Sequence, residues 1–237
     1  MLNILIPMCG KGQRFKDAGY VEPKPFMMVA GMTMIERVVK NLQFIVNDPT
    51  ARFIFVTEDG LFEDIDTSPN PQVVVETKRP TKGAVDTLYC ARQYVCTHDE
   101  LIIANCDQIV DLHPNWWPIP VGKFGSVLTF DCPERSKAWS YVQEDIHGNI
   151  ERIVEKDPIS SQAVVGIYYF KQGWIPSDAA LDILSMGDPM PNGEFYTSSI
   201  IQYMADKGHK IVPHYLPRKW VHMIGTPELL KEYERCL

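Results

Sequence analysis

Several features that would place a chain in a special class are missing from this sequence. It has no low-complexity run, no repeat of fixed period, and no apolar span near the roughly 18 residues that cross a bilayer. The start, from Met1 to Met8, lacks the basic region and the apolar length of a signal peptide. The formal net charge of −7 argues against nucleic-acid binding through a basic surface. We therefore expect a cytoplasmic protein that binds neither membranes nor nucleic acid.

Paired cysteines are missing too. The six cysteines are scattered and form no CxxC pattern, so the sequence indicates neither a disulfide framework nor a zinc site. Free thiols of this kind fit a reducing cytoplasm. Cys9 and Cys106 lie next to the loops described below, and we expect both to be small buried residues.

Two nucleotide-binding motifs are incomplete. Gly10 and Gly12 follow the first apolar run, but Phe15 stands where the dinucleotide fingerprint has its third glycine. The Walker A ending GK[ST] does not occur anywhere in the chain. Dehydrogenases and P-loop NTPases are therefore disfavoured.

The elements that the sequence does contain favour an α/β fold. Strand, loop and helix alternate in the first half and hairpins follow in the second, which predicts a Rossmann-like, mostly parallel but mixed sheet with helices on both faces. The length of 237 residues fits a single domain over 1–237, with one half at 1–110 and the other at 111–237. We expect strands at 2–6, 52–57, 72–76, 101–104, 125–131, 141–143, 150–155, 164–170 and 210–216, and helices beginning near 34, 84, 177, 195 and 227.

The loop after the first strand is a candidate phosphate site. Ligands of open α/β sheets bind at the carboxyl ends of strands. Gly10 and Gly12 let backbone N–H groups approach an anion, and Arg14 and Lys24 add cationic donors. For the two glycines alone, an ordinary surface loop is the simpler interpretation.

Two later segments are expected at the same edge of the sheet. Gly83 precedes a helix whose expected inner face is Ala84, Leu88, Ala91 and Val95, so a phosphate or a flat ligand can come close to the backbone there. Asp107 follows the strand at 101–104 and is a candidate Mg²⁺ ligand. A solvated helix start and a turn-capping aspartate are the plain alternatives.

Taken together, these motifs resemble those of the sugar-phosphate nucleotidylyltransferases. In that family a GxGxRF loop is followed by Pro-Lys-Pro, which here are Gly10 to Phe15 and Pro23 to Pro25. The likeness continues through Asn105-Cys106-Asp107 and Glu155-Lys156 to the closing segment from Trp220 to Glu228.

The resemblance implies a GT-A-like fold and a Mg²⁺-dependent reaction. In this reaction an NTP and a sugar 1-phosphate would give an NDP-sugar and pyrophosphate. The product would be a precursor of surface polysaccharides, and the enzyme could be a homo-oligomer. The resemblance implies that Arg14 would contact the β and γ phosphates of the NTP and that Lys24 would contact the α-phosphoryl group. It further implies nucleotide binding by Pro7, Met8, Gly10, Lys11, Gly12, Lys78, Gly83 and Ala84, binding of the phosphorylated acceptor substrate by Glu155, Lys156, Gly166 and Glu194, and metal binding by Asp107.

Two departures from the family pattern leave alternatives open. Met223 stands where many members have a second acidic metal ligand. A non-catalytic relative that binds nucleotides is therefore an alternative to an active enzyme. The glutamine that thymidylyl members place five residues before the base-binding glycine is Lys78 here, so the base is open. A cytidylyltransferase acting on a non-sugar phosphate such as phosphocholine is a further alternative, since a cation–π cage could come from Trp116, Trp117, Trp139 and Trp174.

Overall fold

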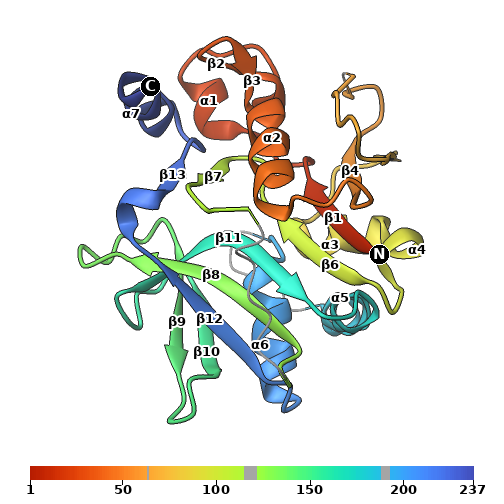
Figure 1. Cartoon of the computed structure of the whole chain (residues 1–237), viewed down its shortest axis with the longest axis vertical. Coiled ribbons are helices and arrows are strands. Elements are labelled where there is room, and N and C mark those ends of the chain that lie inside the picture. Colours follow the sequence, from red (N-terminus) through yellow and green to blue (C-terminus); the bar gives the residue numbers. More distant parts are fainter. Residues whose placement is uncertain (63, 115–121, 188–192) are drawn as a thin grey trace.

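The computed structural model describes residues 1–62, 64–114, 122–187 and 193–237, and a mixed nine-stranded sheet runs through them (Figure 1). The strand order is β10-β9-β11-β6-β1-β4-β5, and β8 lies between β11 and β12. The strands are β1 (Leu2–Pro7), β4 (Arg52–Glu58), β5 (Gln72–Thr77), β6 (Glu100–Ala104), β8 (Gly125–Asp131), β9 (Ser140–Glu144), β10 (Ile150–Glu155), β11 (Gln162–Phe170) and β12 (Ile211–Leu216).

Parallel strands form the amino-terminal part of this sheet. β1 lies between β6 and β4, β5 lies beyond β4, and all four run in the same direction. β11 is antiparallel to β6, β8 and β9. The loops that follow β1, β5 and β6 therefore meet at one edge, and the predicted fold class is confirmed.

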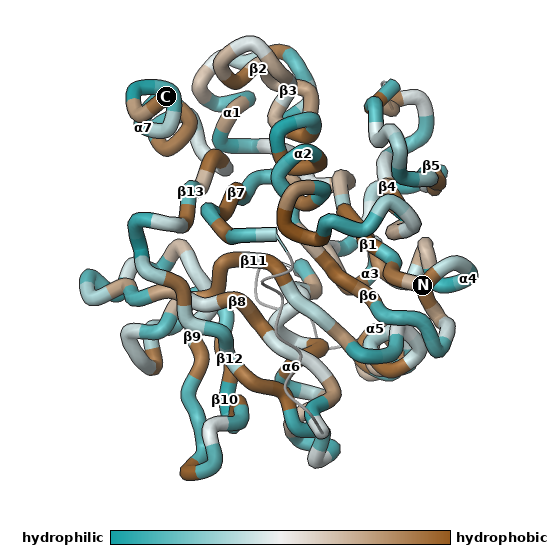
Figure 2. Tube along the Cα trace, viewed as in Figure 1, coloured by the Kyte–Doolittle hydropathy of each residue, from teal (hydrophilic) through white to brown (hydrophobic). Residues whose placement is uncertain are grey.

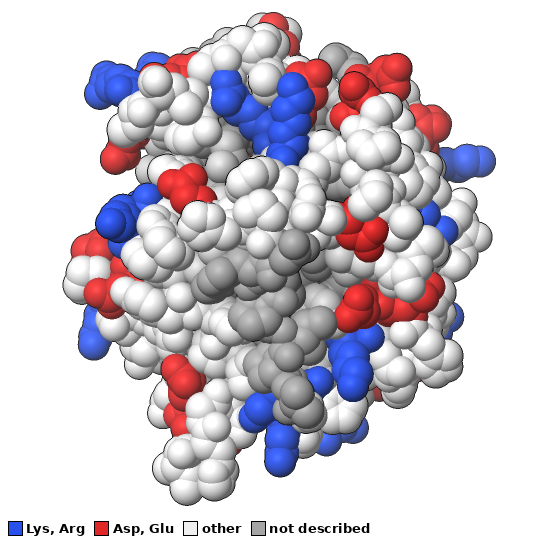
Figure 3. All heavy atoms as spheres, in the orientation of Figure 1, with Lys and Arg blue, Asp and Glu red and all other residues white. Residues whose placement is uncertain are grey.

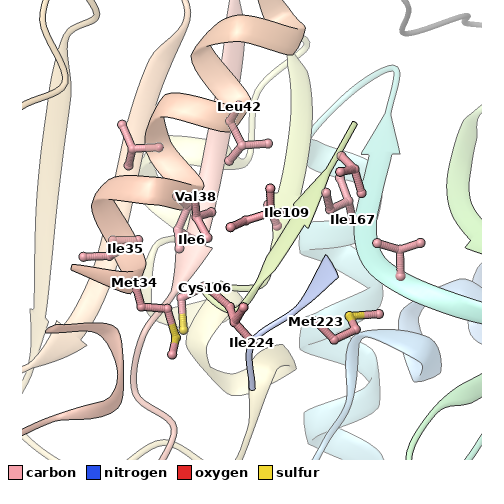
Figure 4. Packing of buried hydrophobic residues seen from close by; sticks show 14 of the residues in the cluster. Ile6, Met34, Ile35, Val38, Leu42, Cys106, Ile109, Ile167, Met223 and Ile224 are labelled. Carbon is pink, nitrogen blue, oxygen red and sulfur yellow. The ribbon is translucent and has the colours of Figure 1, made fainter. Parts of the chain in front are cut away.

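Helices cover both faces of the sheet. Successive strand residues point to opposite sides, so the buried residues of one strand pack in two different clusters. Ile4 and Ile6 of β1 pack in the cluster on the α2 side, whereas Leu5 packs in the cluster with α3, α5 and α6. Figure 4 shows the first cluster, with Ile6 close to Val38 of α2, and Figure 2 shows the hydrophobic stretches along β6 and β8. The helices are α1 (Gln13–Asp17), α2 (Met34–Val46), α3 (Ala84–Cys90), α4 (Arg92–Val95), α5 (Trp174–Met186), α6 (Thr197–Asp206) and α7 (Pro227–Cys236).

Two helix starts have the caps that the sequence predicts. The Thr33 hydroxyl accepts from the Glu36 backbone N–H, and the Glu36 carboxylate accepts from the Thr33 N–H at 2.7 Å, which is a complete capping box for α2. The Thr226 hydroxyl accepts from the Leu229 N–H at 3.3 Å, with Pro227 in the first turn of α7.

The expected helix after Gly83 differs from the observed one. It divides at Ala91 into α3 and α4, and Ala84 is only half-buried because it opens the helix beside two cavities. Several short elements have no counterpart in the expected set, because two to five residues carry no readable periodicity. They are α1, the hairpin of β2 (Met28–Val29) and β3 (Met32–Thr33), the pair of β7 (Gln108–Val110) and β13 (Val221–Met223), and 3₁₀ turns at Lys24–Phe26 and Arg218–Trp220.

The distribution of charged side chains and the character of the helices agree with the amino-acid composition. Basic and acidic side chains are interspersed on the face shown in Figure 3. Over the ranges that the structure describes, no helix combines the length and the apolar character that crossing a bilayer requires.

Candidate active site

Two adjoining cavities open at the edge of the sheet where β1, β5 and β6 end. The loop cavity, of about 280 Å³, is bounded by Pro7–Lys11 and by the segment from Thr81 to Thr87. The hairpin cavity, of about 240 Å³, is lined by residues on or next to β9, β10, β11 and α7, with Trp139, Glu155 and Tyr168 among them, and by residues of the loop after β6. The residues that line both cavities are Lys24, Ala84, Asn105, Asp107 and Tyr196.

An ion pair between Lys24 and Asp107 stands at this shared boundary. The Lys24 ammonium contacts Oδ2 of Asp107, and the Gln108 side-chain amide donates to Oδ1. Both side chains are largely buried, with 18% and 16% of their surface exposed. Burial opposes the charge on Lys24, but the neighbouring Asp107 carboxylate outweighs it, and the pKa of Lys24 is raised. The lysine is therefore a fixed cation at neutral pH.

Small residues make room for this pair. Gly12 has a φ of 61°, and a Cβ there would lie 3.1 Å from the Lys24 Cβ. A Cβ at Gly225 would collide with the Asp107 carboxylate. The Ile224 backbone N–H donates to the Asp107 carbonyl at 3.0 Å, so the segment before α7 is fastened to the loop after β6.

The surroundings of Asp107 bear on metal binding. Met223 pairs with Gln108, the residue after Asp107, across β13 and β7, and both Met223 and Asp107 line the hairpin cavity. The described parts of the chain contain no group of three or more Asp, Glu, His or Cys side chains arranged to hold a metal ion. Mg²⁺ is commonly bound by one or two carboxylates together with substrate phosphates. Asp107 fits the arrangement in which one carboxylate binds the ion together with substrate phosphates.

The loop after β1 and the helix α1 that follows it line different cavities. Gly10 has open space where a Cβ would be, and the predicted residues Pro7, Met8 and Lys11 line the loop cavity beside it. Arg14 lies on α1 and lines the hairpin cavity instead. The two bases of this segment thus face different cavities, which the sequence spacing did not indicate.

The loop before α3 is held by the segment around Phe195. The Phe195 N–H donates to the Lys82 carbonyl at 2.7 Å, and the Phe195 carbonyl accepts from the Val85 N–H at 3.1 Å. Gly83 has a φ of 104° and touches the Phe195 backbone, so no other residue fits there without a shift. Gly83 and Ala84 line the loop cavity as predicted.

Other residues of this loop differ from the expected site. Lys78 is exposed and lines neither cavity. Thr81 and Thr87 line the loop cavity, although no motif marked them. Only their position on either side of Gly83 could have drawn attention to them.

A half-buried carboxylate lies in the hairpin cavity. Glu155, at the end of β10, accepts from the Ser140 hydroxyl and, at 3.3 Å, from the Ser198 hydroxyl. Burial raises the pKa of Glu155, and the Ser140 hydrogen bond opposes that rise. Gly166, also predicted, lines the same cavity with a φ of 100° and packs on the Asn105 and Gln108 side chains.

Lys156 and Glu194, both predicted to bind the acceptor substrate, are joined by a tyrosine. The Lys156 ammonium donates to the Tyr196 hydroxyl at 2.6 Å, and that hydroxyl donates to the Glu194 carboxylate at 2.5 Å. Glu194 lines the loop cavity, whereas Lys156 lines neither cavity. Tyr196, which the sequence did not single out, is thus the side chain that these two groups hold at the shared boundary.

The two cysteines beside the site have the expected character. Cys9 and Cys106 are buried free thiols that line the loop cavity. Burial raises the pKa of the Cys106 thiol to about 11. Cys106 is therefore a neutral packing residue at physiological pH.

Comparison with known proteins agrees with this arrangement. Residues 4–115 match the family model of the MobA-like NTP transferase domain. The part of the chain that resembles an NTP transferase domain is thus a little under half of its length. This match agrees with the family that the motifs indicate, and both the Gly10–Phe15 loop and Asp107 lie within the matched region.

Solved structures share the NTP transferase fold over nearly their whole length. A UDP-glucose pyrophosphorylase complexed with UDP-glucose is 17% identical, with a TM-score of 0.79, and 100% of this chain and 98% of that chain are covered. A nucleoside-diphosphate-sugar pyrophosphorylase from Vibrio cholerae RC9 is 20% identical, with a TM-score of 0.72, and the covered shares are 98% and 99%. At such identities the likeness shows the fold. No curated protein has a sequence that matches the chain.

Proposed function

We propose that the chain is a nucleotidylyltransferase that joins an NTP to a sugar 1-phosphate and releases pyrophosphate. The observation that carries the proposal is the Lys24–Asp107 pair at the boundary of two adjoining cavities. A reaction between two phosphorylated substrates needs one place where both reach the same charged groups. The neighbouring pyrophosphorylase structures support this assignment through their fold.

The reaction is an in-line displacement at the α-phosphorus. An oxygen of the acceptor phosphate forms the new bond to phosphorus, the bond to the bridging oxygen breaks, and its electron pair leaves with pyrophosphate. The attacking phosphate is already ionised near neutral pH, so no general base is required. Catalysis then consists of positioning and neutralisation of charge.

The two cavities divide this work. Backbone groups near Gly10 together with Lys11 hold the triphosphate in the loop cavity. Lys24 neutralises the α-phosphoryl group at the boundary. Because Arg14 lines the hairpin cavity, we assign it to the acceptor phosphate rather than to the β and γ phosphates.

Asp107 would hold Mg²⁺ together with phosphate oxygens of the NTP. The bound ion would neutralise charge on the phosphates. Among the described residues Met223 lines the cavity where a second acidic ligand is expected, so we assign the ion to the carboxylate of Asp107, and the phosphates would supply the remaining charge.

The hairpin cavity supports a sugar as the organic part of the acceptor. Glu155 offers hydrogen-bond acceptors to hydroxyl groups, and Trp139 and Tyr168 offer apolar ring surface. The same three side chains favour a second candidate, a quaternary amine such as phosphocholine, through cation–π attraction and opposite charge. Trp174 packs beside His98, away from the cavity, and Trp116 and Trp117 lie outside the described residues.

Pyrophosphate release tests the proposal directly. The protein is incubated with Mg²⁺, each of the common NTPs, and a panel of sugar 1-phosphates and phosphocholine. We expect release that requires both one NTP and one member of the panel. Release with phosphocholine alone among the acceptors would establish the second candidate. NTP binding without release across the panel would instead identify a non-catalytic relative.

A further inference from the structure

Two threonine hydroxyls in the loop cavity have no role in the chemistry described above. Thr81 lies two residues before Gly83, and Thr87 lies one turn into α3. Their hydroxyl oxygens are 2.8 Å apart, and both residues line the loop cavity. The hydrogen bond between them determines what Thr81 can offer to a ligand.

The count of protons settles the direction of that bond. A threonine hydroxyl has one hydrogen to donate and two lone pairs. The Thr87 hydroxyl donates to the Gly83 carbonyl at 3.0 Å, so the hydrogen between the two threonines comes from Thr81. With its hydrogen used, the Thr81 oxygen can only accept a hydrogen bond from a ligand.

Cys9 does not change this count. Its thiol contacts the Val56 carbonyl at 3.4 Å and the Thr77 hydroxyl at 3.9 Å, and Thr81 is also beside it. Sulfur is a weak donor and a weak acceptor. The thiol therefore leaves the Thr81 lone pairs available to a stronger donor.

The loop that presents Thr81 is fixed in place. The Arg79 guanidinium makes two hydrogen bonds to Asp86, at 2.7 and 2.8 Å, and holds the pKa of that carboxyl below its usual range. Asp86 is buried and also accepts from the Lys82 N–H at 2.8 Å. The Thr77 hydroxyl donates to the Arg79 carbonyl at 3.0 Å. Thr81 is therefore a preorganised hydrogen-bond acceptor.

We infer that Thr81 reads the nucleobase of the NTP by accepting a hydrogen bond from an N–H of the base, and that Thr87 sets this polarity. The inference rests on the proposed function, which places the NTP in the loop cavity. An exocyclic amino group or a ring N–H satisfies Thr81 at this position, whereas a base carbonyl or an unprotonated ring nitrogen does not. Sites built to bond an N–H discriminate against analogues that lack it.

The test compares Thr81→Ser, Thr81→Val and Thr87→Val with the unchanged protein. Binding of each NTP is measured by calorimetry, and turnover by pyrophosphate release. We expect Thr81→Ser to keep the base preference. Thr81→Val should raise KM for the preferred NTP by about tenfold with little change in kcat, as for loss of one uniform binding contact.

Thr87→Val gives a readout that a purely structural role would not produce. The valine keeps the shape of Thr87 but frees the Thr81 hydrogen, so Thr81 can donate. The ranking of the NTPs should shift toward bases that present a carbonyl or ring nitrogen at that point. A second probe is the preferred NTP with its base N–H groups methylated one at a time. One of these analogues should bind the unchanged protein poorly and should lose less affinity on Thr81→Val.

The outcomes separate this inference from the proposed function. Unchanged NTP ranking and KM in both valine variants, alongside normal NTP binding by the parent protein, overturn the role of Thr81 and leave the transferase proposal standing. If the parent protein binds none of the NTPs, both fall. A changed ranking in Thr87→Val, in a protein that retains its thermal stability, supports the inference.

Discussion

The two cavities of the site are built in different ways. The loop cavity is lined largely by short contiguous segments after β1, β5 and β6, with Gly10 and Gly83 among their residues. The hairpin cavity is lined by residues that the fold brings together from segments on or next to β9, β10, β11 and α7, among them Trp139 and Leu229. The first can therefore be recognised from local motifs, whereas the second exists only once the sheet is assembled.

This difference predicts how substitutions should act. Side chains at the shared boundary should affect turnover or both substrates, whereas side chains of the hairpin cavity alone should affect only the acceptor substrate. The predictions below use that contrast, and each has a matched control chosen from the same neighbourhood of the chain.

Lys24→Ala should have the largest effect. Removing one preorganised cation from a transition state costs about 10²–10³ in rate, so kcat should fall by about that factor. Steady-state kinetics with both substrates measure the loss, and circular dichroism checks the fold. Lys16→Ala is the control, because Lys16 is an exposed lysine of α1 that lines neither cavity. Near-normal turnover in Lys24→Ala would remove Lys24 from the chemistry.

Asp107→Asn should act on the dependence on Mg²⁺. Loss of the carboxylate should raise the Mg²⁺ concentration for half-maximal activity by roughly 10–100-fold, the range seen when metal sites lose their support. Asp111→Asn is the control, since Asp111 pairs with His222 and lines neither cavity. An unchanged Mg²⁺ titration would place the metal on another group.

Tyr196→Phe should affect both substrates moderately. The variant keeps the ring but loses the hydroxyl that joins Lys156 to Glu194. We expect KM for the acceptor and for the NTP to rise by about tenfold, as for the loss of hydrogen bonds to charged groups. Tyr203→Phe removes a similar hydroxyl, bonded to Asp182 outside the cavities, and should leave both values unchanged. A rise confined to one substrate would place Tyr196 in a single cavity.

The sequence contained much of the fold and half of the site. Strands such as β8 and β10 are seen with their expected bounds, because buried runs bounded by turns are readable locally. Lys24 and Asp107 could be proposed as neighbours because both come after strands that end at the same edge of the sheet. Tyr196 and Thr81 could not, since their importance comes from hydrogen bonds to residues on other elements. The placement of Arg14 depends on the five-residue helix α1, which has no periodic signal.

Glu155→Gln should have the smallest effect and the most selective one. Among the described residues, Glu155 is the one acidic side chain that lines only the hairpin cavity, so KM for the acceptor should rise by a few-fold while KM for the NTP and kcat change little. Glu151→Gln, on an exposed position of the same strand, is the control. An equal change in KM for the NTP would contradict the separation of the two cavities.

The same variant gives a stability readout with a defined sign. Burial raises the pKa of Glu155 in the folded protein above its ordinary value of 4.5, so the folded state holds this proton more tightly than the unfolded chain does. Its contribution to stability is complete below pH 4.5 and is lost as pH rises through the raised pKa. Glu155→Gln should therefore raise Tm near pH 7.5, well above the ordinary glutamate pKa of 4.5, and the gain should vanish near pH 4. Glu151→Gln should show no such trend. A pH-independent change in Tm for Glu155→Gln would mean that the carboxylate is solvated in the folded protein. The hairpin cavity would then be open to water where it is expected to bind the acceptor substrate.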